Sequence, residues 1–147
     1  MAKKYKVGFT CGVYDLFHIG HLNLLERCKA MCDYLIVGVC DDEYVRKCKN
    51  HEPVIGEQDR LRIIAALKCV DEAEIIDFVT TDDKMVAYEK FKMNVIFAGS
   101  DWEGSERFQR TVKQFEDAGI EMGVEFLPYT QSVSTTMLVE KLKKQGR

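Results

Sequence analysis

Five short apolar runs alternate with amphipathic stretches along this chain, and that alternation limits the possible folds more than any other feature of the sequence. The apolar runs, rich in the β-branched and aromatic side chains typical of buried strands, cover residues 5–13, 34–40, 73–78, 94–99 and 124–128. Apolar residues recur at helical spacing in the stretches 21–32, 57–69, 82–92, 105–119 and 134–145. Because the strands are apolar on both faces and are joined by helices, the pattern predicts a parallel sheet covered on both sides.

Length and composition agree with one packed unit. The chain has 147 residues, and 46% of them are apolar, which suits one real core and argues against disorder. We therefore expect a single α/β domain over residues 1–147, with a Rossmann-like five-stranded parallel sheet and helices on both faces. In such sheets, ligands bind beyond the carboxyl ends of the strands. The site is therefore expected in the loops that follow residues 13, 40, 78, 99 and 128.

Charge and hydropathy exclude several classes of partner. The chain carries 21 basic and 24 acidic residues, a net charge of −3, which argues against a broad nucleic-acid-binding face. No apolar run approaches the roughly 20 residues needed to span a bilayer. The first ten residues, MAKKYKVGFT, contain no long apolar segment followed by a cleavage site. We expect a cytoplasmic protein without a nucleic-acid or membrane partner.

Six cysteines raise the alternatives of disulfides or a zinc site. Cys11, Cys40 and Cys69 fall in or beside apolar segments, so buried reduced thiols are expected rather than a disulfide framework. Cys28 and Cys32 lie four residues apart on a predicted helix, but two further ligands at zinc spacing are missing.

The stretch GVYDLFHIGH, residues 12–21, follows the first predicted strand and opens the first helix. A helix N-terminus offers free N–H groups and a partial positive charge, so it favours phosphate. His18 and His21 lie about one turn apart there, and Gly20 permits close backbone approach. Neither of the usual glycine-rich phosphate-binding motifs is present. One histidine is usually structural, but this pair predicts an anion site, whereas His51 lies in a polar loop and is assigned no role.

These residues resemble a known family. H-x-G-H at 18–21 resembles the signature of the nucleotidyltransferase superfamily, and STT at 134–136 resembles its second signature. GSDWEG at 99–104 narrows the resemblance to the glycerol-3-phosphate cytidylyltransferases, over residues 6–142. The resemblance implies transfer of CMP from CTP to glycerol 3-phosphate or a similar small polyol phosphate, by direct attack of the acceptor on the α-phosphate. It also implies a homodimer that makes a precursor of a cell-wall or capsule polymer.

The same resemblance implies roles for individual residues. It implies that His18 and His21 stabilise the transition state and that Lys49 is catalytic on the pyrophosphate side, with Lys47 as the near alternative. Mg²⁺ is expected to bridge the phosphates, with Asp15 as the nearest carboxylate. The implied nucleotide-binding residues are Gly12, Val13, Asp15, Lys47, Arg60, Ser134, Thr135 and Thr136. The implied acceptor-binding residues are Asp42, Asp101, Trp102 and Tyr129.

Most of these residues also have an ordinary structural interpretation. The hydroxyls of STT cap helices well, and capping is compatible with phosphate binding. The remaining alternatives are a turn for Asp15, a solvated surface cluster for Lys47 and Lys49, an ordinary helix surface for Arg60, and packing for Trp102.

Departures from the family pattern leave the substrate open. Val13 replaces a threonine, and Ser100–Asp101 replaces a pair of aspartates. Tyr129, Gln131 and Ser132 stand where the family has arginine, glutamate and glycine, so one cation near the phosphates is missing. Three hypotheses follow: a CTP-dependent cytidylyltransferase, an enzyme of the same fold that uses ATP or another acceptor such as choline or ethanolamine phosphate, and a weakly catalytic nucleotide-binding or regulatory protein.

Overall fold

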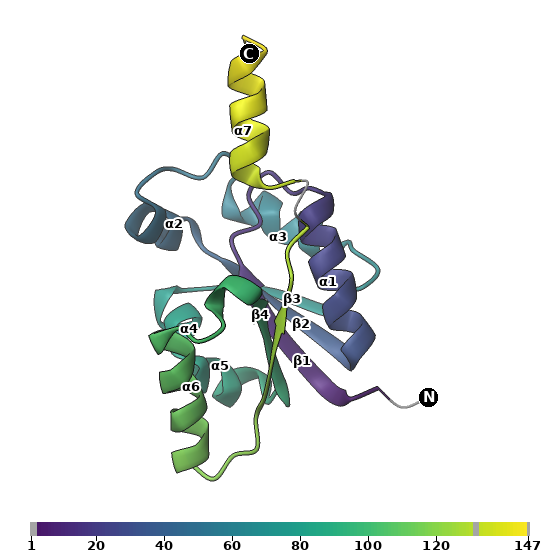
Figure 1. Cartoon of the computed structure of the whole chain (residues 1–147), viewed down its shortest axis with the longest axis vertical. Helices are drawn as coiled ribbons and strands as arrows, with labels where there is room; N and C mark the ends of the chain where they lie inside the picture. The colour runs from purple at the N-terminus through teal and green to yellow at the C-terminus, as the bar shows by residue number, and fades with distance from the viewer. Residues whose placement is uncertain (1–2, 131–132, 147) are drawn as a thin grey trace.

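The computed structural model describes residues 3–130 and 133–146, which form one sheet with helices on both faces (Figure 1). The strands are parallel and lie in the order β3-β2-β1-β4-β5. Their bounds are β1 (Tyr5–Gly12), β2 (Cys32–Cys40), β3 (Glu72–Ile76), β4 (Val95–Gly99) and β5 (Gly123–Leu127). The predicted five-stranded parallel α/β fold is therefore confirmed.

Two short helices were not expected from the sequence. The helices are α1 (Ile19–Met31), α2 (Asp42–Lys49), α3 (Glu57–Ala65), α4 (Phe78–Asp82), α5 (Lys84–Phe91), α6 (Glu106–Asp117) and α7 (Thr135–Lys144), with a 3₁₀ turn η1 (Ser100–Trp102). The sequence pattern does not reveal α2 and α4, because each buries a single residue, Val45 or Thr81, and so has little apolar periodicity. Cys32, expected to end a helix, instead begins β2. None of the helices within the described ranges is long and apolar enough to cross a membrane.

The sheet is buried on both faces, which explains why its central strands are mostly apolar. On one face, Leu25 of α1 and Ile64 of α3 pack against β2. On the other face, Phe91 of α5 and Phe115 of α6 pack in the cluster that contains Phe9 of β1. At roughly 2 kcal/mol for each fully buried large apolar side chain, these two clusters supply the main driving force for the fold.

The strand order indicates where a ligand is expected to bind, in a crevice at the carboxyl ends of β1 and β4. β2 and β3 lie on one side of β1, whereas β4 and β5 lie on the other, so the winding reverses between β1 and β4. Ligands of open parallel sheets bind at such a reversal. The residues that border this one are 13–18, after β1, and 100–105, after β4. α7 begins near this end of the sheet and projects away from it (Figure 1).

Candidate functional site

His18 and His21 cap the first helix with their own rings. His18 is the N-cap residue of α1, and its Nδ1 accepts a hydrogen bond from the Gly20 N–H at 3.0 Å. Nδ1 of His21 accepts one from the His18 N–H at 3.1 Å, which completes a reciprocal capping box. Because both Nδ1 atoms are acceptors, each neutral ring carries its proton on Nε2. Two imidazole N–H donors therefore remain for a ligand beside the start of α1.

The surroundings keep both rings neutral at pH 7. The His21 ring stacks on Phe17, with centroids 5.3 Å apart, and meets the edge of Tyr14 at 5.7 Å. Burial, with a further contribution from nearby His18 and opposition from Asp15, lowers the pKa of His21 to about 4. Burial also lowers the pKa of His18. The pair therefore offers neutral hydrogen-bond donors instead of positive charges.

This pair predicts a loss of stability in acid. Protonating Nδ1 would break the cap, so the unfolded chain, with a histidine pKa near 6.5, takes up protons first as the pH falls. The contribution of His21 is fully present above pH 6.5 and declines toward pH 4. We expect the difference in unfolding free energy between pH 7 and pH 5 to be smaller by about 1 kcal/mol in His21→Asn than in the wild type, after solvent screening of a partly exposed ring. Urea titrations at both pH values measure this difference, and an equal pH dependence in the two proteins would contradict it.

The glycine of H-x-G-H is required by close packing. A Cβ at Gly20 would lie 2.8 Å from Cε1 of His18 and 3.2 Å from Cγ1 of Val133. The absence of a side chain therefore lets residue 133, just before α7, pack against the start of α1. Asn23 of α1 supports this arrangement by donating from Nδ2 to the Thr130 hydroxyl at 3.1 Å.

The start of α7 is held beside the loop after β1. Ser134 caps α7 by accepting from the Met137 N–H at 3.1 Å, so the capping interpretation of STT holds for this residue. The Thr135 hydroxyl donates to the Asp15 carbonyl at 3.3 Å. A cavity of about 390 Å³ lies next to this contact, and Asp15, His51, Thr135 and Thr136 are among its lining residues. The structure thus brings both sequence signatures together and adds His51, which the sequence left without a role.

Asp15 holds the loop that carries this site. Its Oδ1 accepts from the N–H groups of Leu16 and Ile55 at 3.1 and 2.9 Å, and its Oδ2 accepts from the Val54 N–H at 2.8 Å. The flanking Tyr14 and Leu16 adopt positive φ angles of 57° and 51°, so the carboxylate stabilises a turn that side chains seldom adopt. The turn interpretation of Asp15 is therefore supported. Within the described ranges, no group of three histidine, cysteine or acidic side chains is placed to hold a metal.

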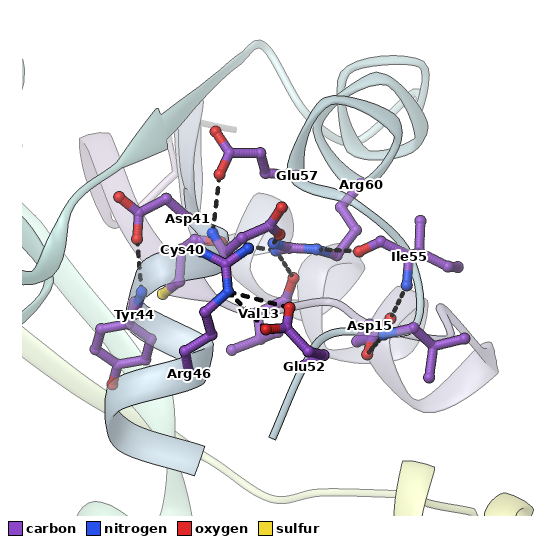
Figure 2. A network of polar contacts seen from close by, with 12 residues as sticks. Val13, Asp15, Cys40, Asp41, Tyr44, Arg46, Glu52, Ile55, Glu57 and Arg60 are labelled. Carbon is purple, nitrogen blue, oxygen red and sulfur yellow. Dashed lines mark hydrogen bonds and ion pairs between the residues drawn. The ribbon is translucent and has the colours of Figure 1, made fainter. Parts of the chain in front are cut away.

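Arg60 joins three loops of the site through four hydrogen-bond partners (Figure 2). Its side chain is fully buried, and Nε donates to the Ile55 carbonyl at 2.8 Å. Nη1 donates to the carbonyls of Val13 and Cys40, both at 2.7 Å. Nη2 pairs with the Asp42 carboxylate at 2.6 Å. In this structure Arg60 has no exposed surface and fixes the loops after β1 and β2, and its expected phosphate contact stays a prediction.

Replacing Arg60 with Lys should destabilise the fold. A single ammonium keeps the charge but cannot reach these four acceptors, and it leaves buried carbonyls unpaired. We expect a loss of about 3 kcal/mol in the free energy of unfolding, measured by urea titration. Arg62→Lys, on the exposed side of the same helix, is the matched control and should stay within about 0.5 kcal/mol. Equal stability of the two variants would contradict this structural role of Arg60.

Three further residues implied by the family resemblance, Asp42, Lys47 and Lys49, lie on α2. Asp42, implied for acceptor binding, pairs with Arg60 through one of its carboxylate oxygens. Lys47 pairs with Glu43 at 3.0 Å on the exposed surface of α2, and Lys49 is exposed at the end of that helix. The structure thus places Lys47 and Lys49 as a solvated cluster and gives neither of them a contact with the histidine pair.

The Tyr129 ring lies over Gly99, the last residue of β4. A Cβ at Gly99 would lie 2.2 Å from the Tyr129 hydroxyl, so only glycine admits this ring over the end of β4. Burial, followed by the charge of Asp101, raises the pKa of Tyr129 to about 12. Trp102 is 37% exposed and has packing partners: the Phe108 ring at 6.1 Å and the Arg107 guanidinium at 5.2 Å from its centroid. Gln131 and Ser132, two of the noted departures, lie outside the described residues.

One buried cationic residue, Lys84, was not among the site residues expected from the sequence. Lys84 is only 6% exposed, and its Nζ donates to the Thr81 carbonyl. Arg107 donates to the same carbonyl at 3.2 Å and pairs with Asp82 at 3.3 Å. No carboxylate of the described chain lies within ion-pair distance of the Lys84 ammonium. A signal was present: lysine at the first residue of a helix opposes the helix dipole, which favours a specific role for the charge.

The sequence model of the cytidylyltransferase-like family matches residues 9–141, a range that contains the histidine pair and the start of α7. The chain belongs to this family. Among similar curated proteins, the bifunctional protein HldE of Koribacter versatilis is 34% identical over 142 residues, 92% of this chain and 27% of that protein. HldE of Caulobacter vibrioides is 34% identical over 146 residues, 96% of this chain and 28% of that protein. The cytidylyltransferase-like chain thus spans about a quarter of the length of these relatives.

Solved structures agree with this assignment. The lipopolysaccharide core biosynthesis protein of Thermoplasma volcanium has a TM-score of 0.70 and 26% identity, over 86% of this chain and 97% of that one. Pantothenate synthetase of Thermus thermophilus has a TM-score of 0.59 at 14% identity, over 99% of this chain and 72% of that one, which shows a shared fold alone. The chain therefore shares its fold as well as its sequence pattern with the cytidylyltransferase-like family.

Proposed function

We propose that this nucleotidyltransferase transfers the nucleotidyl group of a nucleoside triphosphate, with ATP favoured over CTP, to a phosphorylated sugar. The observation that carries nucleotidyl transfer is the pair of neutral imidazole N–H donors beside the start of α1, next to the N-terminus of α7. The similarity to proteins named HldE and to a lipopolysaccharide core biosynthesis protein supports a carbohydrate acceptor. The proposal replaces our first interpretation, a reaction of CTP with glycerol 3-phosphate, by the alternative of an enzyme of the same fold that uses ATP and another acceptor.

The chain's residues suit an in-line displacement at the α-phosphate. An acceptor phosphate oxygen forms the new bond to phosphorus while the bridging oxygen to the β-phosphate leaves with its electron pair as pyrophosphate. His18 and His21 donate from Nε2 to the oxygens on which charge grows, without a proton transfer. The free N–H groups at the start of α7, with Thr135 and Thr136, receive the departing phosphates in the adjacent cavity.

Lys84 suits the acceptor phosphate. A buried ammonium without a carboxylate partner costs several kcal/mol, which an arriving phosphate would offset by pairing with it. Arg107, held on the same carbonyl, adds a second donor. We place the acceptor phosphate at this pair, on the α5 and α6 side of the crevice.

Mg²⁺ would enter with the triphosphate. Asp15 uses both carboxylate oxygens on backbone N–H groups, so it does not fit a metal cage made by the protein. Mg²⁺ commonly keeps several waters and is held largely by substrate phosphates, which suits this site. The homodimer implied by the family resemblance remains a prediction, which light scattering of the purified chain would check.

A substrate panel tests the proposal. ATP and CTP are each combined with hexose 1-phosphate, heptose 1-phosphate, glycerol 3-phosphate, ribitol 5-phosphate, choline phosphate and ethanolamine phosphate, and pyrophosphate release is ranked by kcat/KM. We expect ATP with a sugar phosphate to exceed CTP with glycerol 3-phosphate by at least ~10-fold, a gap of about 1.4 kcal/mol. A preference for CTP and glycerol 3-phosphate would restore the first interpretation. Nucleotide binding without turnover across the panel would favour the regulatory hypothesis. Excess EDTA is the control for metal dependence.

A further inference from the structure

His51 lies beside the start of α7, in the loop of residues 50–56 that joins α2 to α3. Its ring is exposed and lines the cavity of about 390 Å³ together with Thr135, Thr136 and Lys143 of α7. The histidine pair of α1 does not line this cavity. His51 is therefore the histidine that meets a ligand bound at the start of α7.

Asp15 holds both walls of this cavity in place. Its carboxylate accepts from two N–H groups of the loop that carries His51, and its carbonyl accepts from the Thr135 hydroxyl. On the other wall of the same loop, Nε of Arg46 donates to both carboxylate oxygens of Glu52, at 2.9 and 3.0 Å. The ring of His51 is thus presented to the cavity by a loop that is tied down at several points.

The hydrogen bond of the His51 ring decides what its free nitrogen can do. Nδ1 lies 2.9 Å from the Glu52 carbonyl oxygen. A carbonyl only accepts, so Nδ1 carries the proton of the neutral ring and Nε2 carries a lone pair. That lone pair repels a phosphate oxygen, whereas protonation turns Nε2 into a charged donor and leaves the bond to Glu52 intact. His18 and His21 behave in the opposite way, because protonation breaks their caps.

The charges around this cavity leave the balance to His51. The other titratable side chains that line it are Asp15, Glu140 and Lys143. The Asp15 carboxylate is already matched by three backbone N–H groups, and Glu52, next to His51, is paired with an arginine of α2. Lys143 and Glu140 are opposite in sign. A phosphate anion in this cavity therefore meets a net positive charge when His51 is protonated.

We propose that His51 binds the departing pyrophosphate as an imidazolium, so that the protein takes up a proton when pyrophosphate binds and returns it when pyrophosphate leaves. Nε2 gains this proton from the buffer, and no covalent bond between heavy atoms changes. Histidine suits such a role because its charge commonly changes between pH 5 and pH 8. The source of the pyrophosphate rests on the proposed function, whereas the binding step does not.

Calorimetry with inorganic pyrophosphate measures this proton uptake without using enzyme activity. Titrations at pH 7 in two buffers of different ionisation enthalpy give the number of protons taken up for each bound anion. Because pyrophosphate itself titrates, the reference is His51→Gln, whose amide can donate but cannot become charged. We expect the wild type to take up at least ~0.3 more protons than His51→Gln, and its affinity to fall at least ~5-fold more between pH 6 and pH 8.

A second variant separates charge from titration. Lys143→Met should weaken pyrophosphate binding at both pH values and keep the proton uptake of the wild type, because the lysine ammonium stays charged throughout this range. Circular dichroism checks that both variants are folded. Equal proton uptake in the wild type and His51→Gln would overturn the proposal, as would a wild type that does not bind pyrophosphate.

Long-range ¹H–¹⁵N spectra of the histidine rings test the tautomer in the wild type itself. We expect the neutral His51 ring to carry its proton on Nδ1, and saturating pyrophosphate to increase the cationic fraction of this ring at pH 7. A proton on Nε2 of the neutral ring, or an unchanged ring with pyrophosphate bound, would overturn the proposal. If no pair of substrates is turned over, the proposed function fails, while these binding measurements still decide the role of His51.

Discussion

Replacing His18 or His21 with Asn is expected to lower kcat by ~10²-fold or more while the fold remains intact. Each ring uses Nδ1 to cap α1 and leaves Nε2 for the ligand. The short asparagine amide places its oxygen near the position of Nδ1, so the cap survives, but nothing replaces the Nε2 donor. Loss of one preorganised donor to a developing charge typically costs about 3 kcal/mol.

Alanine at the same positions separates the two roles. His18→Ala removes the cap as well as the donor, so it should lose about 1 kcal/mol of stability that His18→Asn retains. Steady-state kinetics with the preferred substrates, together with urea unfolding of all four variants, measures both effects. Wild-type kcat in both asparagine variants would show that the imidazoles serve the helix and not the reaction.

Replacing Lys84 with Met is expected to lower kcat/KM for the acceptor by ~10²-fold. The ammonium is almost completely buried, so its interaction with a phosphate is not weakened by water as a surface pair would be. Methionine keeps the length and the apolar stem but lacks the charge. Because an unpaired buried charge is costly, the stability of the variant should equal or exceed that of the wild type.

Comparing the effects of Lys84→Met on the nucleotide and on the acceptor tests whether Lys84 binds the acceptor phosphate. KM for the nucleotide should change less than ~3-fold, because the triphosphate lies at the histidines and α7 in the proposed arrangement. Lys90→Met is the matched control: it lies on the same helix, is exposed, and pairs with Glu74 at 3.1 Å, so its kinetics should match the wild type. Unchanged acceptor kinetics in Lys84→Met would place the acceptor phosphate elsewhere.

Much of this site could be predicted from patterns of residues that are close together in the sequence. H-x-G-H could be interpreted from the sequence because the donors, the glycine and the helix N-terminus are neighbours in the chain. Ser134 was likewise readable as a cap, since its partner, the Met137 N–H, is three residues away. The parallel sheet could be predicted because strands that are apolar on both faces need cover on both sides. The assignment of phosphate chemistry to this end of the sheet therefore needed no coordinates.

Hydrogen-bond partners that are far apart in the sequence could not be predicted in this way. Arg60 and Asp15 look like surface and metal-binding residues in the sequence, yet their side chains find hydrogen-bond partners up to 47 and 40 residues away. Lys84 looks like an ordinary helix lysine until α5 and α6 pack on the sheet and bury it. The sequence by itself determined the sheet and five of its helices and predicted the anion site, because each depends on spacing over a few residues. Only the tertiary structure decided which charged side chains are buried ties and which remain available to a ligand, because burial and partner choice depend on segments that meet only after folding.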